Sequence, residues 1–311
     1  MITRLGAPVP APPEWPVYQF HGDHDQSTHG NRDGGSAGPS EPAPSLRSWR
    51  VSDGDTLKRH KPDGKNWTRE RKALHERLVK KAISKVAPAE GGKPTLYMMG
   101  GGPAAGKSDL VKNNLVDHPD AAHSVRVDPD EIKGELPEYR QLVAVGNLEA
   151  AGIVHEESSH VSKRVIDEAL KSGRHTVYDS TGDGSIESLS GKIAAARAAG
   201  AKRIEADYVT VPTEMAVQRA LARAKNPESS SFGRLPDLKI VRETHRKVSE
   251  VLPQAIQRGL FDKVKVWEST GRTPRLIAEA RGARITVHDQ AAWKRFLAKA
   301  DEDDGDGTVY D

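Results

Sequence analysis

The sequence predicts an α/β protein in which a parallel β-sheet is flanked by helices. Short apolar runs, each long enough for one buried strand, alternate with segments whose apolar residues recur at helical spacing. A glycine-rich loop follows the first run and precedes a helix-forming segment. The chain has 311 residues, 36% hydrophobic and 29% charged, so it can form a core of its own. A disordered arm before this region and a small extension after it complete the predicted organisation.

The composition excludes several kinds of site. The chain has no cysteine, so disulfides, thiolate zinc sites and cysteine nucleophiles are ruled out. No apolar run reaches the roughly 18 residues that a membrane helix needs, and the first residues lack the apolar core of a secretory signal. We therefore expect a cytoplasmic protein with no membrane partner. The formal net charge of +3 is too small to favour nucleic acid as a general partner.

The amino-terminal arm, residues 1–66, is expected to be low in complexity and largely disordered. Its first part is rich in proline, glycine and polar residues, which bury too little apolar surface to offset the entropy of the chain. His21, His24 and His29 either belong to this solvated tract or bind a metal. The whole arm is either disordered or docks on a partner such as a phage particle.

The main domain is expected over residues 67–270, and its leading helix begins near Thr68. The outer face of that helix is basic and either is solvated or contacts phosphates. Beyond it, strands are expected at 96–99, 124–127, 176–178, 208–211 and 264–267, and helices at 107–115, 150–171, 186–199, 213–224 and 238–257. A small extension, residues 271–300, follows, with a strand expected near 284–287 and then a last helix. An acidic tail, residues 301–311, ends the chain.

The most specific motif is a phosphate-binding loop between the first strand and its helix. Its sequence, Gly-Gly-Pro-Ala-Ala-Gly-Lys-Ser, matches G-x-x-x-x-G-K-[ST]. Glycines let main-chain N–H groups turn toward a β-phosphate, and the helix that starts there adds the positive end of its dipole. Lys107 then reaches the β- and γ-phosphates, and Ser108 offers its hydroxyl to Mg²⁺. The residues expected to bind ATP or GTP are Gly101, Gly102, Pro103, Ala104, Ala105, Gly106, Lys107 and Ser108.

Polar side chains follow the second and third predicted strands. Asp128 and Asp130 lie on the loop that leaves the second strand, at the edge where such sheets bind ligands. One carboxylate can orient Mg²⁺ while the other accepts the proton of an attacking hydroxyl, or Asp130 only caps the next helix. After the third strand, Thr181 can donate to a substrate oxygen, and Asp179 either joins the site or only fixes the turn.

Arginine residues follow the fourth predicted strand. Arg219 and Arg223 are four positions apart and share one helix face, and Arg234 lies beyond a segment of helix-breaking residues. An arginine on such a loop can close over a triphosphate and stabilise the charge on the transferring phosphoryl group. The alternative is that these arginines are solvated surface residues.

Taken together, these motifs resemble the zeta toxin family. The resemblance rests on the phosphate loop, on Val-Asp-Pro-Asp-Glu-Ile after the second strand, on His-Glu-Glu-Ser-Ser from His155 and on Asp-Ser-Thr-Gly from Asp179. It covers about residues 95–267 and implies a P-loop kinase-like fold. It also implies transfer of the γ-phosphoryl group of ATP to the 3′-hydroxyl of the sugar in UDP-N-acetylglucosamine. A toxin of this family normally has a protein inhibitor, which is expected to be a separate antitoxin chain unless the helix near Thr68 partly takes its place.

The resemblance also implies roles for individual residues. Lys107 is similar to the phosphate-loop lysine of the family, and Asp130 to its general base. Thr181 is similar to a threonine that contacts the sugar nucleotide. Arg223 and Arg234 are similar to two arginines that hold the triphosphate and its transition state.

The substrate side departs from the family pattern. Lys163 stands where zeta toxins have a glutamate, and the nearest acid is Glu157. Glu157 is therefore expected to contact the substrate, together with Asp128, which is also expected to bind Mg²⁺. Because a cation for an anion changes substrate recognition, other acceptors stay open: an antibiotic or a nucleic-acid 5′ end. A phage-associated nucleotide-binding module without catalysis is the remaining alternative.

Overall fold

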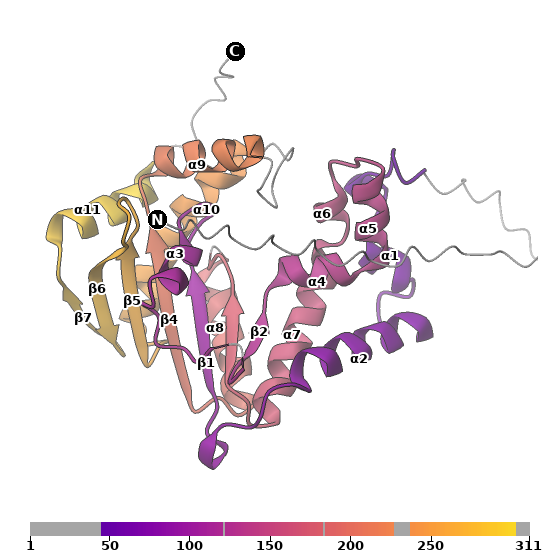
Figure 1. Ribbon diagram of the computed structural model, residues 1–311, viewed down its shortest axis with the longest axis horizontal. Helices are drawn as coiled ribbons and strands as arrows, with labels where there is room; N and C mark the ends of the chain where they lie inside the picture. The colour runs from indigo at the N-terminus through magenta and orange to yellow at the C-terminus, as the bar shows by residue number, and fades with distance from the viewer. Residues whose placement is uncertain (1–44, 121, 183, 227–236, 303–311) are drawn as a thin grey trace, which may run out of the picture. The chain divides into compact units, whose positions relative to one another are not determined.

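The computed structural model describes residues 45–302, with gaps at residues 121, 183 and 227–236. A β-sheet flanked by helices forms its centre, which confirms the predicted α/β class (Figure 1). In the described ranges the strands are Thr95–Gly100 (β1), Val125–Val127 (β2), Thr176–Asp179 (β3), Arg203–Thr210 (β4), Lys263–Glu268 (β5), Arg275–Arg281 (β6) and Arg284–Val287 (β7). They form one seven-stranded sheet in the order β2-β3-β1-β4-β5-β6-β7.

Strands β1 to β5 are parallel, as predicted, but the complete sheet is mixed. β6 pairs antiparallel with β5, and β7 pairs antiparallel with β6. The sequence predicted β7 but not β6, because charged residues interrupt the apolar run of that strand. β6 buries Ile277 and Ala278 in the main core together with Phe296 of the last helix. Residues 271–300 are therefore a continuation of the main domain and not a separate extension.

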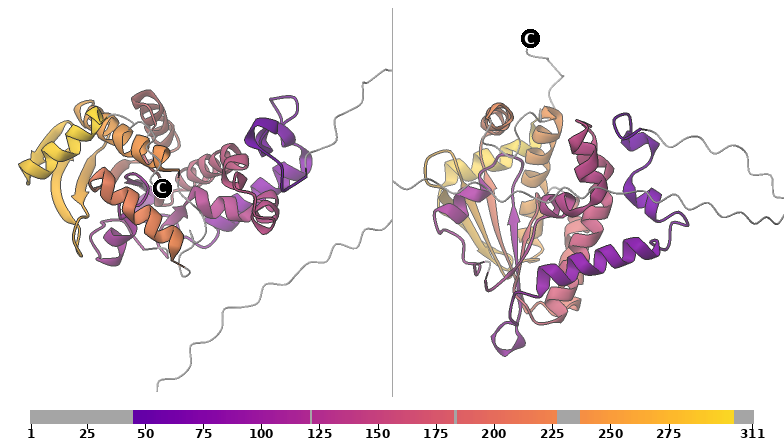
Figure 2. Two further views of the ribbon diagram at one scale, coloured as in Figure 1. Left: turned by 90° about the horizontal axis from the view of Figure 1, so that it is seen from above. Right: turned by 45° about the vertical axis from the view of Figure 1, so that its right-hand side comes forward.

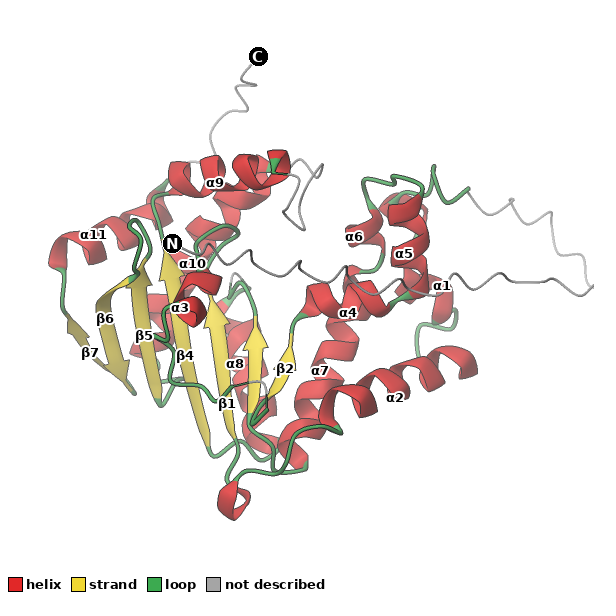
Figure 3. Ribbon diagram, in the orientation of Figure 1, coloured by secondary structure: helices red, strands yellow, loops and turns green. Residues whose placement is uncertain are grey.

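The helices, coloured red in Figure 3, are Thr56–His60 (α1), Arg69–Ile83 (α2), Lys107–Lys112 (α3), Pro129–Glu135 (α4), Pro137–Ala144 (α5), Ala150–Ile153 (α6), His155–Lys171 (α7), Ile186–Ala198 (α8), Thr213–Lys225 (α9), Leu238–Gln257 (α10) and Gln290–Ala298 (α11). Ser185 and Asp237 cap α8 and α10 by accepting hydrogen bonds from main-chain N–H groups. One helix was predicted over residues 150–171, but α6 and α7 form it in two pieces that meet at Val154. Among these helices none has the length and hydropathy needed to cross a bilayer.

Helices cover the two faces of the sheet unequally. α7, α8, α10 and α11 pack against one face, and α3 packs against the other (Figure 1). α2 lies beside α7 and shares a smaller core with it and β2 (Figure 2). Because β1 to β5 are parallel, their carboxyl ends meet at one edge of the sheet. The loops that carry Lys107, Asp128 and Thr181 leave from that edge.

Residues 45–66 belong to the folded body, so the prediction that they are disordered is wrong. Trp49 is 3% exposed and packs in one cluster with Leu142 and Ile153. The Asn147 amide donates hydrogen bonds of 2.7 and 2.8 Å to the main-chain carbonyls of Leu46 and Trp49. Composition failed here because the apolar partners of one tryptophan lie about a hundred residues further along the chain. Residues 1–44 and 303–311, for which disorder was also expected, lie outside the described residues.

Candidate active site

The phosphate loop has the backbone shape that its sequence predicts. Gly101 and Gly106 have φ values of 124° and 99°, and Ala104 also has a positive φ of 58°. A Cβ at Gly101 would lie 2.4 Å from the Val209 carbonyl oxygen, and one at Gly106 would lie 2.7 Å from the Ser269 hydroxyl. Left-handed residues in such a loop turn main-chain N–H groups toward an anion, and α3 starts directly after them. The residues and the backbone therefore fit a triphosphate.

Lys107 and Asp179 face each other beside this loop. The Lys107 ammonium donates to the Gly101 carbonyl at 3.2 Å and lies 3.5 Å from the Asp179 carboxylate. Burial raises the pKa of Asp179, the charge of Lys107 opposes that rise, and the charge of Asp128 adds to it. Lys107, Ser108, Asp128 and Asp179 line one pocket of about 390 Å³. Asp179, whose role the sequence left open, is therefore part of the site.

The two carboxylates after β2 occupy different positions. The Asp128 side chain accepts a hydrogen bond of 2.8 Å from the main-chain N–H of Asp130, so Asp128 is the cap of α4. The alternative that Asp130 is the cap is therefore wrong. Asp130 is 82% exposed in its side chain and forms an ion pair of 2.9 Å with Lys133. Asp128 lines the pocket of Lys107, and Asp130 is not among the residues that line it.

Among the predicted arginines, Arg223 is exposed at the end of α9, and Arg234 lies outside the described residues. Arg219, to which no role was assigned, is closer to the phosphate loop. One of its terminal nitrogens donates to the Ser269 carbonyl at 2.7 Å, and the other is buried with no partner among the described residues. Ser269 is also the residue that a side chain at Gly106 would meet. Arg219 is therefore a further candidate for contact with the triphosphate.

His245 of α10 is a second residue that the sequence did not reveal. It is 1% exposed, and its Nε2 lies 3.0 Å from the Pro103 carbonyl oxygen. A Cβ at Gly102 would lie 2.4 Å from the imidazole ring, so this ring fixes the back of the phosphate loop. Burial lowers the pKa of His245 to about 4, and the charges of Lys299 and Lys107 contribute. A neutral ring that donates from Nε2 to Pro103 accounts for this contact.

The comparison with known families agrees with this geometry. A model of the zeta toxin family matches residues 79–288, which is more than half of the chain. The chain belongs to the zeta toxin family.

Relatives of this zeta toxin family member include proteins of solved structure. An AvrRxo1-ORF1:AvrRxo1-ORF2 complex with ATP has a TM-score of 0.57 at 19% identity, over 86% of this chain and 82% of that chain. The PezAT toxin–antitoxin system of Streptococcus pneumoniae has a TM-score of 0.51 at 13% identity, over 69% and 81%. These likenesses establish a shared fold, the kinase-like α/β fold of the family.

A curated relative matches a shorter stretch. It is a calmodulin calcium-dependent NAD kinase from Arabidopsis thaliana, 32% identical over 95 residues. The matched stretch is 28% of this zeta toxin family chain and 18% of the relative. The chain thus spans less than a fifth of that protein, whose activity as a whole is not carried over by the match.

The substrate-side residues of the zeta toxin prediction are divided between two places. The Thr181 carbonyl accepts a hydrogen bond of 2.9 Å from the Gly101 N–H, so the loop after β3 lies against the phosphate loop. Glu157 is instead fully buried. Its carboxylate binds the guanidinium of Arg71 and lies 2.6 Å from the His75 ring. Glu157 is therefore not accessible to a ligand, contrary to the expected substrate contact.

The surroundings of Glu157 explain that difference. Arg71 of α2 bridges Glu157 on α7 and Glu138 on α5, with contacts of 2.7 to 3.0 Å to Glu138. Although burial opposes ionisation, the hydrogen bonds from His75 and Arg71 hold the pKa of Glu157 at about 2. The ionised carboxylate thus fixes α2 to the domain. The spacing of motifs in the sequence could not predict this partner, because Arg71 lies on α2, which precedes all of those motifs.

Replacement of Glu157 by glutamine is expected to destabilise the protein by about 3 kcal/mol, because the buried Arg71 would lose one of its two charge partners and keep only Glu138. Urea denaturation at pH 7 measures the change in the free energy of unfolding. Glu156→Gln is the matched control, since Glu156 is exposed on the same helix and its replacement should change little. Equal stabilities of the two variants would contradict a structural role for Glu157.

His245 is expected to make stability fall with pH below neutrality. Its pKa is about 4 in the folded protein against 6.5 in the unfolded chain, so the unfolded chain binds the proton more readily. The contribution is complete above pH 6.5 and is lost as the pH falls toward 4. The free energy of unfolding of His245→Gln should therefore depend less on pH over this interval than that of wild type. A variant of the exposed His123 should keep the wild-type dependence of the unfolding free energy on pH. If His245→Gln keeps it too, the low pKa of His245 in the folded protein is contradicted.

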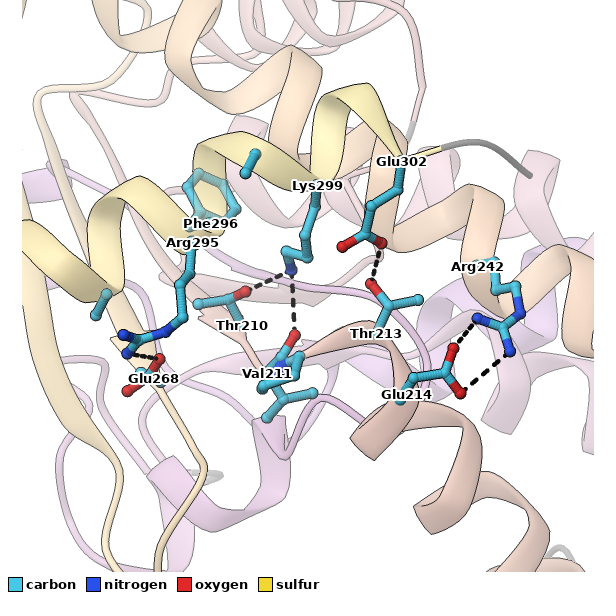
Figure 4. A pocket seen from close by; sticks show the side chains of 13 residues that line it. Thr210, Val211, Thr213, Glu214, Arg242, Glu268, Arg295, Phe296, Lys299 and Glu302 are labelled. Atoms are coloured by element: carbon cyan, nitrogen blue, oxygen red, sulfur yellow. Dashed lines mark hydrogen bonds and ion pairs between the residues drawn. The ribbon is translucent and has the colours of Figure 1, made fainter. Parts of the chain in front are cut away.

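A larger pocket of about 510 Å³ lies elsewhere, at the carboxyl end of β4 between α9, α10 and α11 (Figure 4). The buried Lys299 donates to the Thr210 hydroxyl at 2.6 Å, and Glu268 pairs with Arg295 at 2.8 Å. None of the predicted site residues lines this pocket. The pocket of larger volume is therefore not the one beside the phosphate loop.

Proposed function

We propose that this protein is an ATP-dependent phosphotransferase whose acceptor is a sugar hydroxyl of a nucleotide. The observation that carries the proposal is the pocket in which Lys107 and Ser108 of the phosphate loop meet Asp128 and Asp179. The lysine and the loop N–H groups suit the phosphates of the donor, and carboxylates beside them suit the proton of an alcohol. The structurally similar AvrRxo1 complex that contains ATP supports ATP as the donor.

In the proposed reaction the acceptor oxygen bonds to the γ-phosphorus as the bond to the β–γ bridging oxygen breaks, and ADP leaves. The hydroxyl proton passes to a carboxylate, which we assign to Asp130 on the family resemblance. Mg²⁺, when bound, neutralises charge on the phosphate oxygens, and Ser108 and Asp128 are the residues that would hold it. Arg219 and Arg223 supply positive charge for the transition state.

Two acceptors follow from different observations. The family resemblance favours the 3′-hydroxyl of UDP-N-acetylglucosamine. The match to a plant NAD kinase favours a ribose hydroxyl of NAD, and Lys163 in place of a family glutamate is a reason to test it. Both molecules carry a diphosphate and a sugar hydroxyl, so the same site chemistry serves either one.

The test is incubation of the full chain with Mg²⁺, ATP or GTP, and one acceptor at a time. Mass spectrometry should detect an acceptor with one added phosphoryl group and an equal amount of nucleoside diphosphate. Nucleotide binding without any phosphorylated acceptor would favour the non-catalytic alternative. Phosphorylation of an antibiotic or of a nucleic-acid 5′ end in place of both nucleotides would correct the acceptor class.

A separate inhibitor chain remains a proposal of the same kind. The PezAT structure comes from a toxin–antitoxin system, which supports an antitoxin partner here. α2 is fixed to the domain by Arg71, so it is part of the fold and does not take the place of an inhibitor.

We also propose that residues 1–44 dock on a partner. Deletion of those residues tests this, because kinase activity should survive the deletion.

A further inference from the structure

The pocket beside the phosphate loop has a cationic far wall. β2 is the edge strand next to β3, and its Val125 and Val127 pack into the core with α7. Arg126 lies between them in the strand and lines the same pocket as Lys107 and Ser108. Lys112 of α3 and His118 from the following loop also line it. An arginine on an edge strand thus shares a pocket with the phosphate loop.

The guanidinium of Arg126 is held in place by neutral groups. It donates to the Pro119 carbonyl at 2.8 Å and lies 3.4 Å from His118 Nε2. His118 Nδ1 lies 3.0 Å from the same carbonyl and must donate to it, which leaves Nε2 as an acceptor. Burial and the charge of Arg126 lower the pKa of His118, in agreement with a neutral ring.

Arg126 also lacks a counter-ion. In the described ranges it forms no ion pair, and at least its Nε–H and one Nη1–H have no acceptor. Burial lowers the pKa of Arg126, and only the charge of Asp120 opposes this. A half-buried guanidinium with spare N–H donors matches a phosphate group, whose oxygens accept charge-assisted hydrogen bonds.

A second pocket continues from this point. Its volume is about 250 Å³, and it shares Arg126, Asp128 and Glu131 with the first. Its walls hold apolar side chains of α2, α4 and α7, among them Leu78 and Val161, and also charged ones, Lys81, Lys85 and Glu135. A ligand with a sugar near Lys107 and an aromatic base near Leu78 would place its linking phosphates at Arg126.

We propose that Arg126 binds the phosphate or diphosphate group of the acceptor, at the junction of these two pockets. The inference rests on the proposed function and deepens it, because it requires an acceptor with a phosphate between its sugar hydroxyl and its base. The donor triphosphate is expected at the loop after β1, and β3 lies between β1 and β2, so Arg126 stands on the side of the pocket away from that loop. Glu131 and Asp128 line the junction too, so the spare N–H donors of the guanidinium, more than the net charge of the junction, select the anion.

Calorimetric titration with inorganic pyrophosphate tests the anion site directly. The protein used is the Lys107→Ala variant, in which the phosphate loop is weakened as a competing site. Adding Arg126→Gln should lower the pyrophosphate affinity about tenfold or more, and Arg126→Lys should restore part of it. Arg140→Gln, which removes an exposed arginine of α5, is the control and should have no effect. Thermal unfolding of each variant verifies that the fold is intact.

A second titration uses otherwise unchanged protein with UDP-N-acetylglucosamine, NAD and ATP. Arg126→Gln should lower the affinity for the phosphate-bearing acceptor about tenfold or more and leave the affinity for ATP unchanged. The inference is wrong if pyrophosphate affinity is the same with and without Arg126, if pyrophosphate does not bind at all, or if ATP affinity falls as much as acceptor affinity. Pyrophosphate binding that needs Arg126, in a protein that phosphorylates no acceptor, would instead refute the proposed function alone.

Discussion

Replacement of Lys107 by alanine is expected to lower the rate of phosphoryl transfer by about 10³-fold or more, because the cation that faces the β- and γ-phosphates is lost. The Lys107 ammonium is already held at the site by the Gly101 carbonyl and by Asp179, so little rearrangement separates it from a bound triphosphate. Product formation measured by mass spectrometry at saturating ATP gives the turnover, and titration gives the ATP affinity.

The control for this variant is Lys294→Ala. Lys294 is exposed on α11, far along the chain from the phosphate loop, and its loss should leave turnover unchanged. Circular dichroism shows whether each variant is folded. Turnover by folded Lys107→Ala that equals the wild-type value would mean that the phosphate loop does not carry the chemistry.

Replacement of Asp130 by asparagine is expected to lower turnover by about 10²- to 10⁴-fold, because the general base is lost. Nucleotide affinity should stay the same, because Asp130 makes no contact with the phosphates. Asp128→Asn should act differently. An asparagine can still cap α4, but the pocket loses a carboxylate beside Ser108, so the Mg²⁺ concentration needed for half-maximal rate should rise. Titration of the rate with Mg²⁺ therefore separates the two roles.

The ion pair between Asp130 and Lys133 provides the matched control. Lys133→Gln breaks the same pair but keeps the Asp130 carboxylate. If Lys133→Gln lowers turnover as much as Asp130→Asn does, Asp130 acts only through that pair. If Asp128→Asn abolishes turnover at every Mg²⁺ concentration and Asp130→Asn is active, the base is Asp128, the carboxylate that lines the pocket.

Elements with a clear local signal were predicted closely. α10 begins and ends at the predicted residues, since its apolar positions repeat over its full length and Asp237 caps its start. β4 was expected to begin at Tyr208 but begins at Arg203. Arg203 and Glu205 interrupt the apolar run because α3 leaves part of that face of the sheet uncovered, so the early residues of β4 bury only one side.

The candidate site was predictable where one motif carries it and not where distant elements meet. The phosphate loop and Asp128 were found because strand, turn and helix follow one another in the sequence. Arg219 and His245 were not predicted, because they reach the phosphate loop through contacts with Ser269 and Pro103, which are distant from them in the sequence. Glu157 was misassigned for the same reason, because Arg71 comes from a helix that no motif connects to it.

The burial of Trp49 sets a limit on how far the chain can be shortened for expression. A fragment that starts at α2, the first helix that the sequence predicts, would lack the Trp49 indole. The apolar side chains of Leu142 and Ile153 would then be exposed to water. Such an uncovered patch favours self-association and poor yield. Crystallisation and enzymology of the catalytic body are therefore best begun upstream of Ser45.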